Sequence, residues 1–205
     1  MSLEYLIPTL AILILSLSFH EAAHAWAADR LGDPTARMLG RLTLNPLAHI
    51  DWIGTVLFPL IAFSTGAPLI GWAKPVPVSM LNLKAPRRDF AVVAAAGPAS
   101  NLVLAVGAAT IMTITGIEPQ VAGGELVGRL LTLTIIMNVL LAIFNMIPVP
   151  PLDGGNVLAG IAPESIARIF DQLRPYGIFI LYALLIFDGF RFIYPVQDFV
   201  LSWLL

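Results

Sequence analysis

The stretch LEYLIPTLAILILSLSFHEAAHAWAA, residues 3–28, is apolar over nearly its whole length but contains His20, Glu21 and His24 toward its carboxyl end. At about 1.5 Å per residue, a helix of this length reaches roughly 39 Å, which is enough to cross a bilayer with some tilt. An ionisable side chain at the centre of a membrane helix costs about 2.5–3.5 kcal/mol on insertion scales, so three of them require a functional reason. The stretch therefore predicts a membrane helix that carries a chemical site.

The spacing of these residues, H-E-x-x-H, is typical of a zinc site. Side chains four residues apart on a helix lie one turn above each other, so both imidazoles can bind one metal ion while Glu21 points to its open position. Catalytic zinc commonly has a third protein ligand. The best candidate is Asp153, because it follows a helix break and precedes two glycines that allow close backbone approach. The other candidates are His49 and, with less support, Asp29, Asp33 and Asp51.

The composition indicates a membrane protein, since 58% of the residues are hydrophobic, 12% are charged and the mean hydropathy is +0.87. The net charge of −2 is small and no basic stripe is present, so nothing points to nucleic acid. The absence of cysteine excludes disulfides and thiolate metal sites. We expect an all-α integral membrane protein, a multi-span helical bundle with about four to six membrane segments.

The chain, residues 1–205, is expected to form a single membrane-embedded domain. After the first helix, at 3–28, the segment 36–72 is predicted to hold a small β-hairpin and then an apolar stretch, interrupted by Gly and Pro, that re-enters the membrane. A short surface helix is expected at 163–174. The predicted spans are 90–116, 126–147 and 176–190, and an apolar C-terminal segment covers 192–205.

The loops predict the orientation of the protein in the membrane. The loop at 74–89 carries four basic residues, whereas the loop after the next span carries two glutamates and no Lys or Arg. By the positive-inside tendency, the first of these loops is cytoplasmic. If 53–72 re-enters rather than crosses, His24 and Asp153 emerge at similar depth on the cytoplasmic side. A full crossing would place them on opposite faces, and we therefore expect re-entry.

Three motifs follow one another along the chain: F-H-E-x-x-H-A at 19–25, G-P-x-x-N at 97–101 and N-x-x-P-x-x-P-L-D-G at 145–154. In this order they resemble the site-2 protease family of intramembrane zinc metalloproteases. The resemblance covers most of residues 19–155. It implies an enzyme that hydrolyses peptide bonds within or near transmembrane segments of other membrane proteins.

The resemblance also implies roles for individual residues. Glu21 would be the general base for the attacking water, and Asn145 would contact the substrate backbone or the developing oxyanion. Asn101 would help to hold the core or the substrate, although amides also join neighbouring membrane helices. One zinc ion per chain would be bound by His20, His24 and Asp153.

The layout is similar to a compact prokaryotic form of the family, without a PDZ or regulatory domain. It implies a multi-pass protein of the plasma membrane whose active site lies toward the cytoplasm. Its partners would be a transmembrane protein substrate and the lipid bilayer, with a homo-oligomer or a regulatory membrane partner as further possibilities. The hairpin around 42–47 could hold an unwound substrate by β-strand addition.

A metal or proton transporter is the main alternative, because His, Glu and Asp inside a membrane also mark transport pathways. A transporter predicts repeated halves and a polar path to both faces, and the sequence contains neither. An inactive relative acting as a scaffold is disfavoured by the presence of Glu21, and lipid hydrolysis is a remote option. Two histidines and an aspartate could also bind Fe, Co or Mn.

Overall fold

A computed structural model of the protein describes residues 3–65, 71–120 and 125–205. The all-helical prediction is confirmed for these residues. The helices are α1 (Leu3–Arg30), α2 (Thr35–Met38), η1 (Pro46–Ala48), η2 (Trp52–Leu57), α3 (Phe58–Thr65), η3 (Met80–Asn82), α4 (Pro86–Thr115), α5 (Leu126–Asn145), α6 (Asp153–Ile161), α7 (Glu164–Leu173), η4 (Arg174–Tyr176), α8 (Gly177–Ile186) and α9 (Ile193–Leu204).

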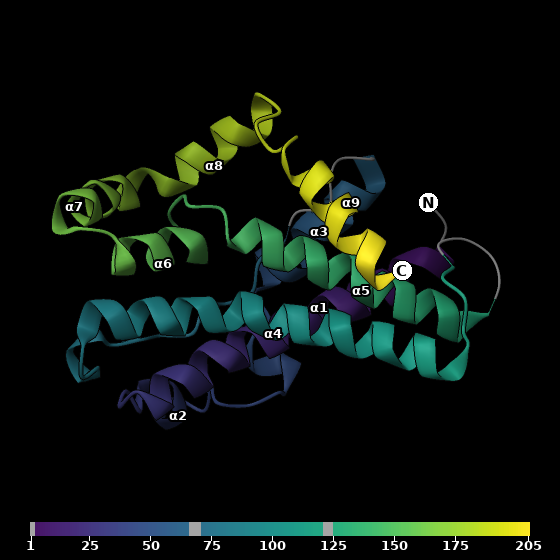
Figure 1. Cartoon of the computed structure of the whole chain (residues 1–205), viewed down its shortest axis with the longest axis horizontal. Coiled ribbons are helices and arrows are strands. Elements are labelled where there is room, and N and C mark those ends of the chain that lie inside the picture. Colours follow the sequence, from purple (N-terminus) through teal and green to yellow (C-terminus); the bar gives the residue numbers. More distant parts are fainter. Residues whose placement is uncertain (1–2, 66–70, 121–124) are drawn as a thin grey trace.

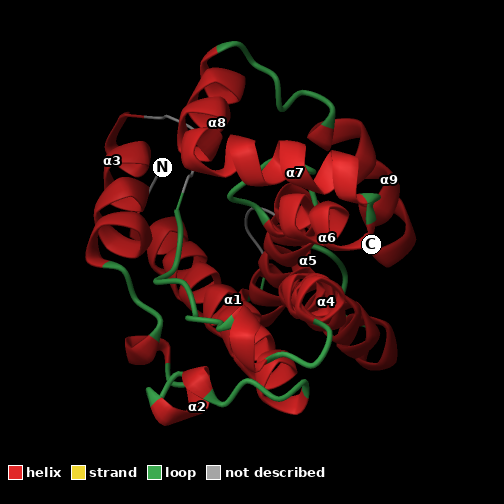
Figure 2. Ribbon diagram, turned by 90° about the vertical axis from the view of Figure 1, so that its left-hand side faces the viewer, coloured by secondary structure: helices red, strands yellow, loops and turns green. Residues whose placement is uncertain are grey.

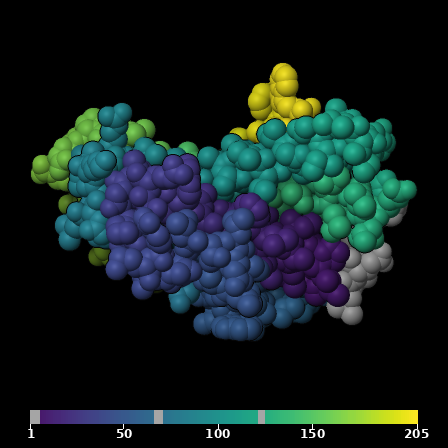
Figure 3. Space-filling model, turned by 90° about the horizontal axis from the view of Figure 1, so that it is seen from below, coloured from purple at the N-terminus to yellow at the C-terminus, as the bar shows by residue number. Residues whose placement is uncertain are grey.

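The long helix α4 is the centre of the bundle. It packs against α1, α5 and α6, while α9 lies across α5 (Figure 1). Viewed along the bundle, α1, α4 and α5 lie together and α3 stands on the side of α1 away from α4 (Figure 2). The N-terminal part of the chain, coloured purple to blue, forms much of the face seen in Figure 3. Helices α1, α4, α5 and the run from α7 to α8 are each long and apolar enough to cross a membrane.

Helix α4 has clear end signals. Pro86 occupies its first turn, where a missing N–H costs nothing. The Asp89 carboxylate accepts the Ala85 N–H at 2.7 Å, and Gly116 ends the helix in the left-handed conformation with φ 67°. The helix therefore starts four residues before the predicted span at 90–116, and the G-P-x-x-N motif lies well inside it.

The connection from α5 to α6 brings the third motif back toward α1. Helix α5 ends at Asn145, before the proline-rich turn, and α6 begins at Asp153. Gly154 lies directly against the backbone of Met146 and Ile147, so that any side chain there would collide with their carbonyl groups. This close approach positions the first residue of α6 in the bundle.

The predicted β-hairpin is wrong, since the described part of the segment 36–72 contains helices and turns without a strand. Polar side chains satisfy the backbone locally and remove the need for a strand ladder. The Asn45 side chain accepts the Leu47 N–H at 3.1 Å, and Asp51 caps η2 by accepting the N–H groups of Ile53 and Gly54. With the hairpin absent, the β-addition surface expected at 42–47 is absent too.

The apolar segment that follows forms one short helical run, Trp52–Thr65. At about 1.5 Å per residue it is roughly 21 Å long, shorter than the hydrocarbon core of about 30 Å. The far end of the segment returns to its start, because the Trp72 N–H donates to Gly54 at 3.2 Å and Thr55 donates to the Trp72 carbonyl at 2.7 Å. This return favours re-entry, which stays a prediction; the stretch 66–70 lies outside the described residues.

The C-terminal region differs from the prediction in its boundaries. The expected surface helix and the expected span at 176–190 join into one helical run through η4, which ends at Ile186. The expected apolar segment at 192–205 forms α9, which packs on α5 through Val200, Leu201 and Leu204.

Candidate metal centre

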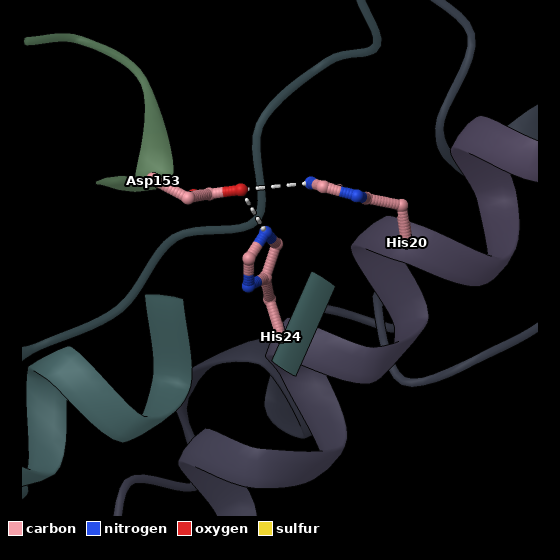
Figure 4. Close-up of side chains that lie close together, drawn as sticks. All are labelled: His20, His24 and Asp153. Carbon is pink, nitrogen blue, oxygen red and sulfur yellow. Dashed lines mark ion pairs between the residues drawn. The ribbon is translucent and has the colours of Figure 1, made fainter. Parts of the chain in front are cut away.

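His20 and His24 lie one turn apart on α1, and Asp153 faces them from the start of α6 (Figure 4). The Asp153 Oδ2 atom is 3.0 Å from His20 Nε2 and 3.4 Å from His24 Nε2. All three ligand atoms lie within 4.8 Å of one another. Both histidines are buried, with 4% and 9% of their surface exposed. The structure thus brings together the three residues that the third motif and the H-E-x-x-H motif predict as metal ligands.

The second ring nitrogen of each histidine has a partner on α4. The Nδ1 atom of His24 lies 2.8 Å from the Val93 carbonyl oxygen, and that of His20 lies 2.7 Å from the Asn101 side-chain oxygen. Because an oxygen of either kind accepts, each Nδ1 donates its proton and each Nε2 presents a lone pair to the site. Asn101, for which the sequence left two roles open, therefore contacts a candidate ligand directly.

The cluster fits a zinc ion. Asp153 Oδ2 is a buried oxygen without a hydrogen-bond partner, although it faces two imidazole nitrogens. A Cβ at Gly97 would lie 2.5 Å from the Nε2 atoms of both histidines, so the absence of a side chain leaves the space beside them open. Two imidazole nitrogens and one carboxylate oxygen are a typical ligand set for catalytic zinc with an open fourth position. No side-chain signal in the sequence predicts this role for Gly97.

Glu21 is 9% exposed and accepts a hydrogen bond from the Val76 N–H, at 2.8 Å from Oε2. Val76 lies between two prolines and supplies the only N–H group of the three residues. The bond holds Oε2 in place and leaves the second oxygen, Oε1, for a water molecule. Val76 cannot be identified from the sequence, because a backbone donor leaves no side-chain signal. The Pro-Val-Pro pattern is the one sequence feature that marks its position.

The segment that carries Val76 is fixed to the end of α1 by Asp33, which is fully buried. Its carboxylate accepts the Ser79 N–H at 2.6 Å, the Asn82 amide at 2.8 Å and the Thr35 hydroxyl at 2.5 Å. Burial alone would raise the pKa of Asp33, but the hydrogen bonds from Asn82, Thr35 and Ser79 hold it below its ordinary value. Asp33, a minor ligand candidate in the sequence, therefore acts as a clamp.

A second set of contacts fixes the same segment at Lys74. Its N–H donates to the His49 carbonyl at 2.8 Å, and its carbonyl accepts from the Arg41 guanidinium at 2.5 Å. The ring of His49 is buried and bonds through Nε2 to the Thr43 carbonyl at 2.8 Å. The candidate metal cluster of the described residues does not include His49, Asp29, Asp33 or Asp51.

Asn145, the last residue of α5, is half-buried. Its side-chain amide donates to the Leu141 carbonyl, one turn earlier, at 3.0 Å. Its role toward a substrate stays a prediction.

Arg87 ties the far end of α6 to α4. Its guanidinium donates to the carbonyls of Ala159 and Ala162 at 2.6 and 2.8 Å and to Glu164 at 2.6 Å. These carbonyls belong to the last turn of α6 and the residue that follows it, where no intrahelical donor is left. The sequence suggested only a topology signal for this arginine; the structure gives it a place in the support of the helix that carries Asp153.

Comparison with known proteins points to one family. The model of "Peptidase family M50" matches residues 109–187. "Putative zinc metalloprotease YwhC" of Bacillus subtilis (strain 168) is 38% identical over 200 residues, which are 96% of this chain and 85% of that protein. The chain belongs to the site-2 protease family, peptidase family M50.

A second relative, "Putative zinc metalloprotease Rip2" of Mycolicibacterium smegmatis, is 29% identical over 173 residues, or 84% of this chain and 64% of that protein. No solved structure matches the chain significantly. Family membership makes this chain a zinc metalloprotease with Zn²⁺ as its metal. With four helices of membrane-spanning length and composition, it is a multi-pass membrane protein.

Proposed function

We propose that this site-2 protease family member hydrolyses peptide bonds within or near the transmembrane segments of other membrane proteins. The observation that carries the proposal is the place of the candidate site. His20, His24 and Glu21 are buried on α1, a helix of membrane-spanning length, and α4 and α5, two more such helices, pack against it. A peptide bond that reaches these residues must itself lie at membrane depth.

In the proposed reaction, His20, His24 and Asp153 hold the metal. A zinc ion bound there supplies Lewis acidity, which polarises a peptide carbonyl and makes a water molecule acidic enough to lose a proton near neutral pH. Glu21 takes that proton at Oε1 while the Val76 N–H holds Oε2. Glu21 then passes the proton to the leaving amine.

The substrate helix must unwind locally, because a helical peptide bond is shielded by its own hydrogen bonds. Asn145 is proposed to contact the unwound backbone or the developing oxyanion. Its position supports this proposal, since it ends α5 eight residues before Asp153. Reorientation of its amide away from Leu141 would free its donors for the substrate.

We further propose that the chain is one membrane-embedded protease domain, 1–205, of a prokaryotic plasma membrane, with its site toward the cytoplasm. The basic stretch at 74–89, which ends in the first turn of α4, supports this orientation by the positive-inside tendency, and Val76 in the same stretch reaches Glu21. A transmembrane protein substrate and the bilayer are the proposed partners, together with a homo-oligomer or a regulatory membrane protein.

The test is cleavage of a tagged single-span protein by the purified chain in liposomes. Glu21→Gln removes the base and leaves the candidate zinc ligands in place, so cleavage should fall about 10²- to 10⁴-fold at unchanged zinc content. Glu118→Gln, a change of the same kind at an exposed loop position, should have no effect. A chelator should abolish cleavage and zinc should restore it.

A zinc-loaded chain that leaves a panel of single-span substrates intact would contradict the proposal. So would cleavage by Glu21→Gln at the wild-type rate. Zinc or proton flux through proteoliposomes without any cleavage would point to the transporter alternative instead.

A further inference from the structure

Three polar side chains form a chain of hydrogen bonds through the middle of the helix bundle. Ser16 on α1, Asn101 on α4 and Asn138 on α5 are 2%, 0% and 0% exposed. The Asn138 amide nitrogen donates to the Ser16 hydroxyl at 2.9 Å, and the Asn101 amide nitrogen donates to the Asn138 oxygen at 2.8 Å. This series of hydrogen bonds ends at the candidate metal ligand His20, whose Nδ1 lies 2.7 Å from the Asn101 oxygen.

A backbone carbonyl fixes the direction of every bond in this chain. The Thr134 carbonyl, which lies 2.8 Å from the Asn138 amide nitrogen, can only accept. Asn138 must therefore turn its nitrogen to Thr134 and its oxygen to Asn101. That oxygen also only accepts, so Asn101 turns its nitrogen to Asn138 and its oxygen to His20. His20 must then donate from Nδ1, which leaves the lone pair on Nε2.

The two histidines differ in how this proton is placed. His24 bonds to the backbone carbonyl of Val93, a group with one possible role. His20 bonds to a side-chain amide, whose two ends are an acceptor and a donor. An Asn101 amide turned the other way would present N–H to His20 and draw the ring into the tautomer that lacks a lone pair at Nε2. Two acceptors decide between these states: the Asn138 oxygen, 2.8 Å from the Asn101 amide nitrogen, and the Ser16 backbone carbonyl, which makes a longer contact with the same nitrogen at 3.4 Å. The shorter bond makes Asn138 the stronger of the two.

We propose that Asn138 is a positioning residue of the metal centre, which acts through Asn101 to hold His20 in the tautomer whose Nε2 faces the metal. The proposal rests on the assignment of His20 as a zinc ligand in the proposed function. Asn138 belongs to none of the three motifs, and lies seven residues before Asn145. In this dry position, an inverted amide would set two oxygens or two N–H groups against each other, and a buried polar group without a partner costs about 1–3 kcal/mol.

A purely structural role of Asn138 predicts a loss of stability without a loss of zinc affinity. Amides that join membrane helices contribute to stability, and their removal should lower the unfolding temperature without a specific effect on zinc. The discriminating quantity is therefore the zinc dissociation constant, measured on the full chain in detergent by competition with a chromophoric chelator, without any substrate.

The first variant is Asn138→Leu, which keeps the approximate shape and removes all hydrogen bonds. We expect zinc binding about tenfold weaker or more, in the range found for outer-shell partners of metal ligands. The matched control is Thr132→Val on the same helix. Thr132 is equally buried and bonds to Gly128 and Gln120, so its loss should cost stability and leave zinc affinity unchanged.

Asn138→Ser serves if Asn138→Leu does not fold. A serine hydroxyl can still bond to the Thr134 carbonyl within its own helix, but it is too short to reach Asn101. The same loss of zinc affinity is expected. Asn138→Asp should rescue binding, because a carboxyl group in an apolar environment stays protonated, donates to Thr134 and accepts from Asn101.

A double-mutant cycle completes the test. If Asn138 acts through Asn101, then Asn138→Leu should cost little further zinc affinity once Asn101→Leu is present. Full additivity of the two changes, or wild-type affinity in Asn138→Leu, would overturn the proposal. A wild-type chain that binds zinc tightly but cleaves nothing would overturn the proposed function and leave this inference standing.

Discussion

One added methyl group at Gly97 tests the position of the metal centre. The new Cβ would lie 2.5 Å from the Nε2 atoms of His20 and His24, whereas ordinary contact begins at 3.4 Å. The rings or α4 must therefore move apart by about 0.9 Å, while metal–ligand distances tolerate only about 0.2 Å. At least one of the two imidazole bonds should be lost. We expect zinc binding at least about 100-fold weaker in Gly97→Ala, at or beyond the upper end of outer-shell effects.

The helix itself should not suffer from this change. Alanine is favoured over glycine inside a helix by about 0.8–1.0 kcal/mol. Gly107→Ala is the matched control, because Gly107 lies on the same helix and an added Cβ there meets no atom within 4 Å. It should gain in stability and keep full zinc affinity.

The assay is equilibrium competition for zinc with a chelator of known affinity, together with the zinc content of the purified variants and cleavage of a single-span substrate. Circular dichroism and the unfolding temperature report whether Gly97→Ala is folded. If folded Gly97→Ala binds one zinc ion with wild-type affinity, the metal does not lie between these imidazoles and the site described above is wrong.

Three further predictions concern the surroundings of the site. Val76→Pro removes the N–H group that donates to Glu21, and a hydrogen bond to a charged group contributes about 1.5–3 kcal/mol. Cleavage by Val76→Pro should therefore fall about 10- to 100-fold at unchanged zinc content, whereas Val76→Ala should cleave at close to the wild-type rate. Because the folded-state pKa of Asp33 lies below its ordinary value of 3.8, the ionised carboxylate stabilises the fold above that pH, and this stability should disappear as the pH falls through the folded-state pKa. Compared with the wild type, Asp33→Asn should unfold at a lower temperature at pH 7, and its unfolding temperature should change less on acidification. A lysine at position 87 cannot reproduce the forked contacts of Arg87 to the end of α6, so Arg87→Lys should weaken zinc binding several-fold in the same competition assay. Arg88→Lys, at an exposed position, should leave zinc binding unchanged.

The sequence predicts the long helices well because their signal is strong. Apolar runs of eighteen residues or more mark α1, α4 and α5, and Gly or Pro marks their ends. It fails at 36–51, where short β-prone pieces predict strands and the structure has helices and turns. Asn45 and Asp51 cap short helices there instead, and such local side-chain bonds compete with a strand ladder at little cost in free energy.

The candidate site likewise contains residues that the sequence predicts and residues that it does not. The candidate ligands His20, His24 and Asp153 can be proposed from the sequence because their side chains carry the chemistry, in motifs with a recognisable spacing. Val76 and Gly97 cannot, because one contributes a backbone N–H and the other contributes the absence of a side chain. Their roles depend on which segments lie beside α1, and this only the packing of the whole bundle determines.

The arrangement of the helices explains how the candidate metal centre is held inside the bundle. Two of the candidate ligands lie on α1, and acceptors on α4 bind both of their Nδ1–H groups. The orientation of the imidazoles therefore depends on how these two long helices pack. The third candidate ligand comes from α6, a nine-residue helix that packs on α4 so closely that a side chain at Gly160 would collide with Ala91. Buried polar groups must be satisfied by protein when no water is available, and Asp153 Oδ2 has no hydrogen-bond donor of its own. The lone pairs of both histidines converge on this oxygen, and a cation between them satisfies all three atoms at once. The bundle therefore favours the metal-bound state electrostatically, and the position of α6 is the part of the fold that the metal should stabilise most.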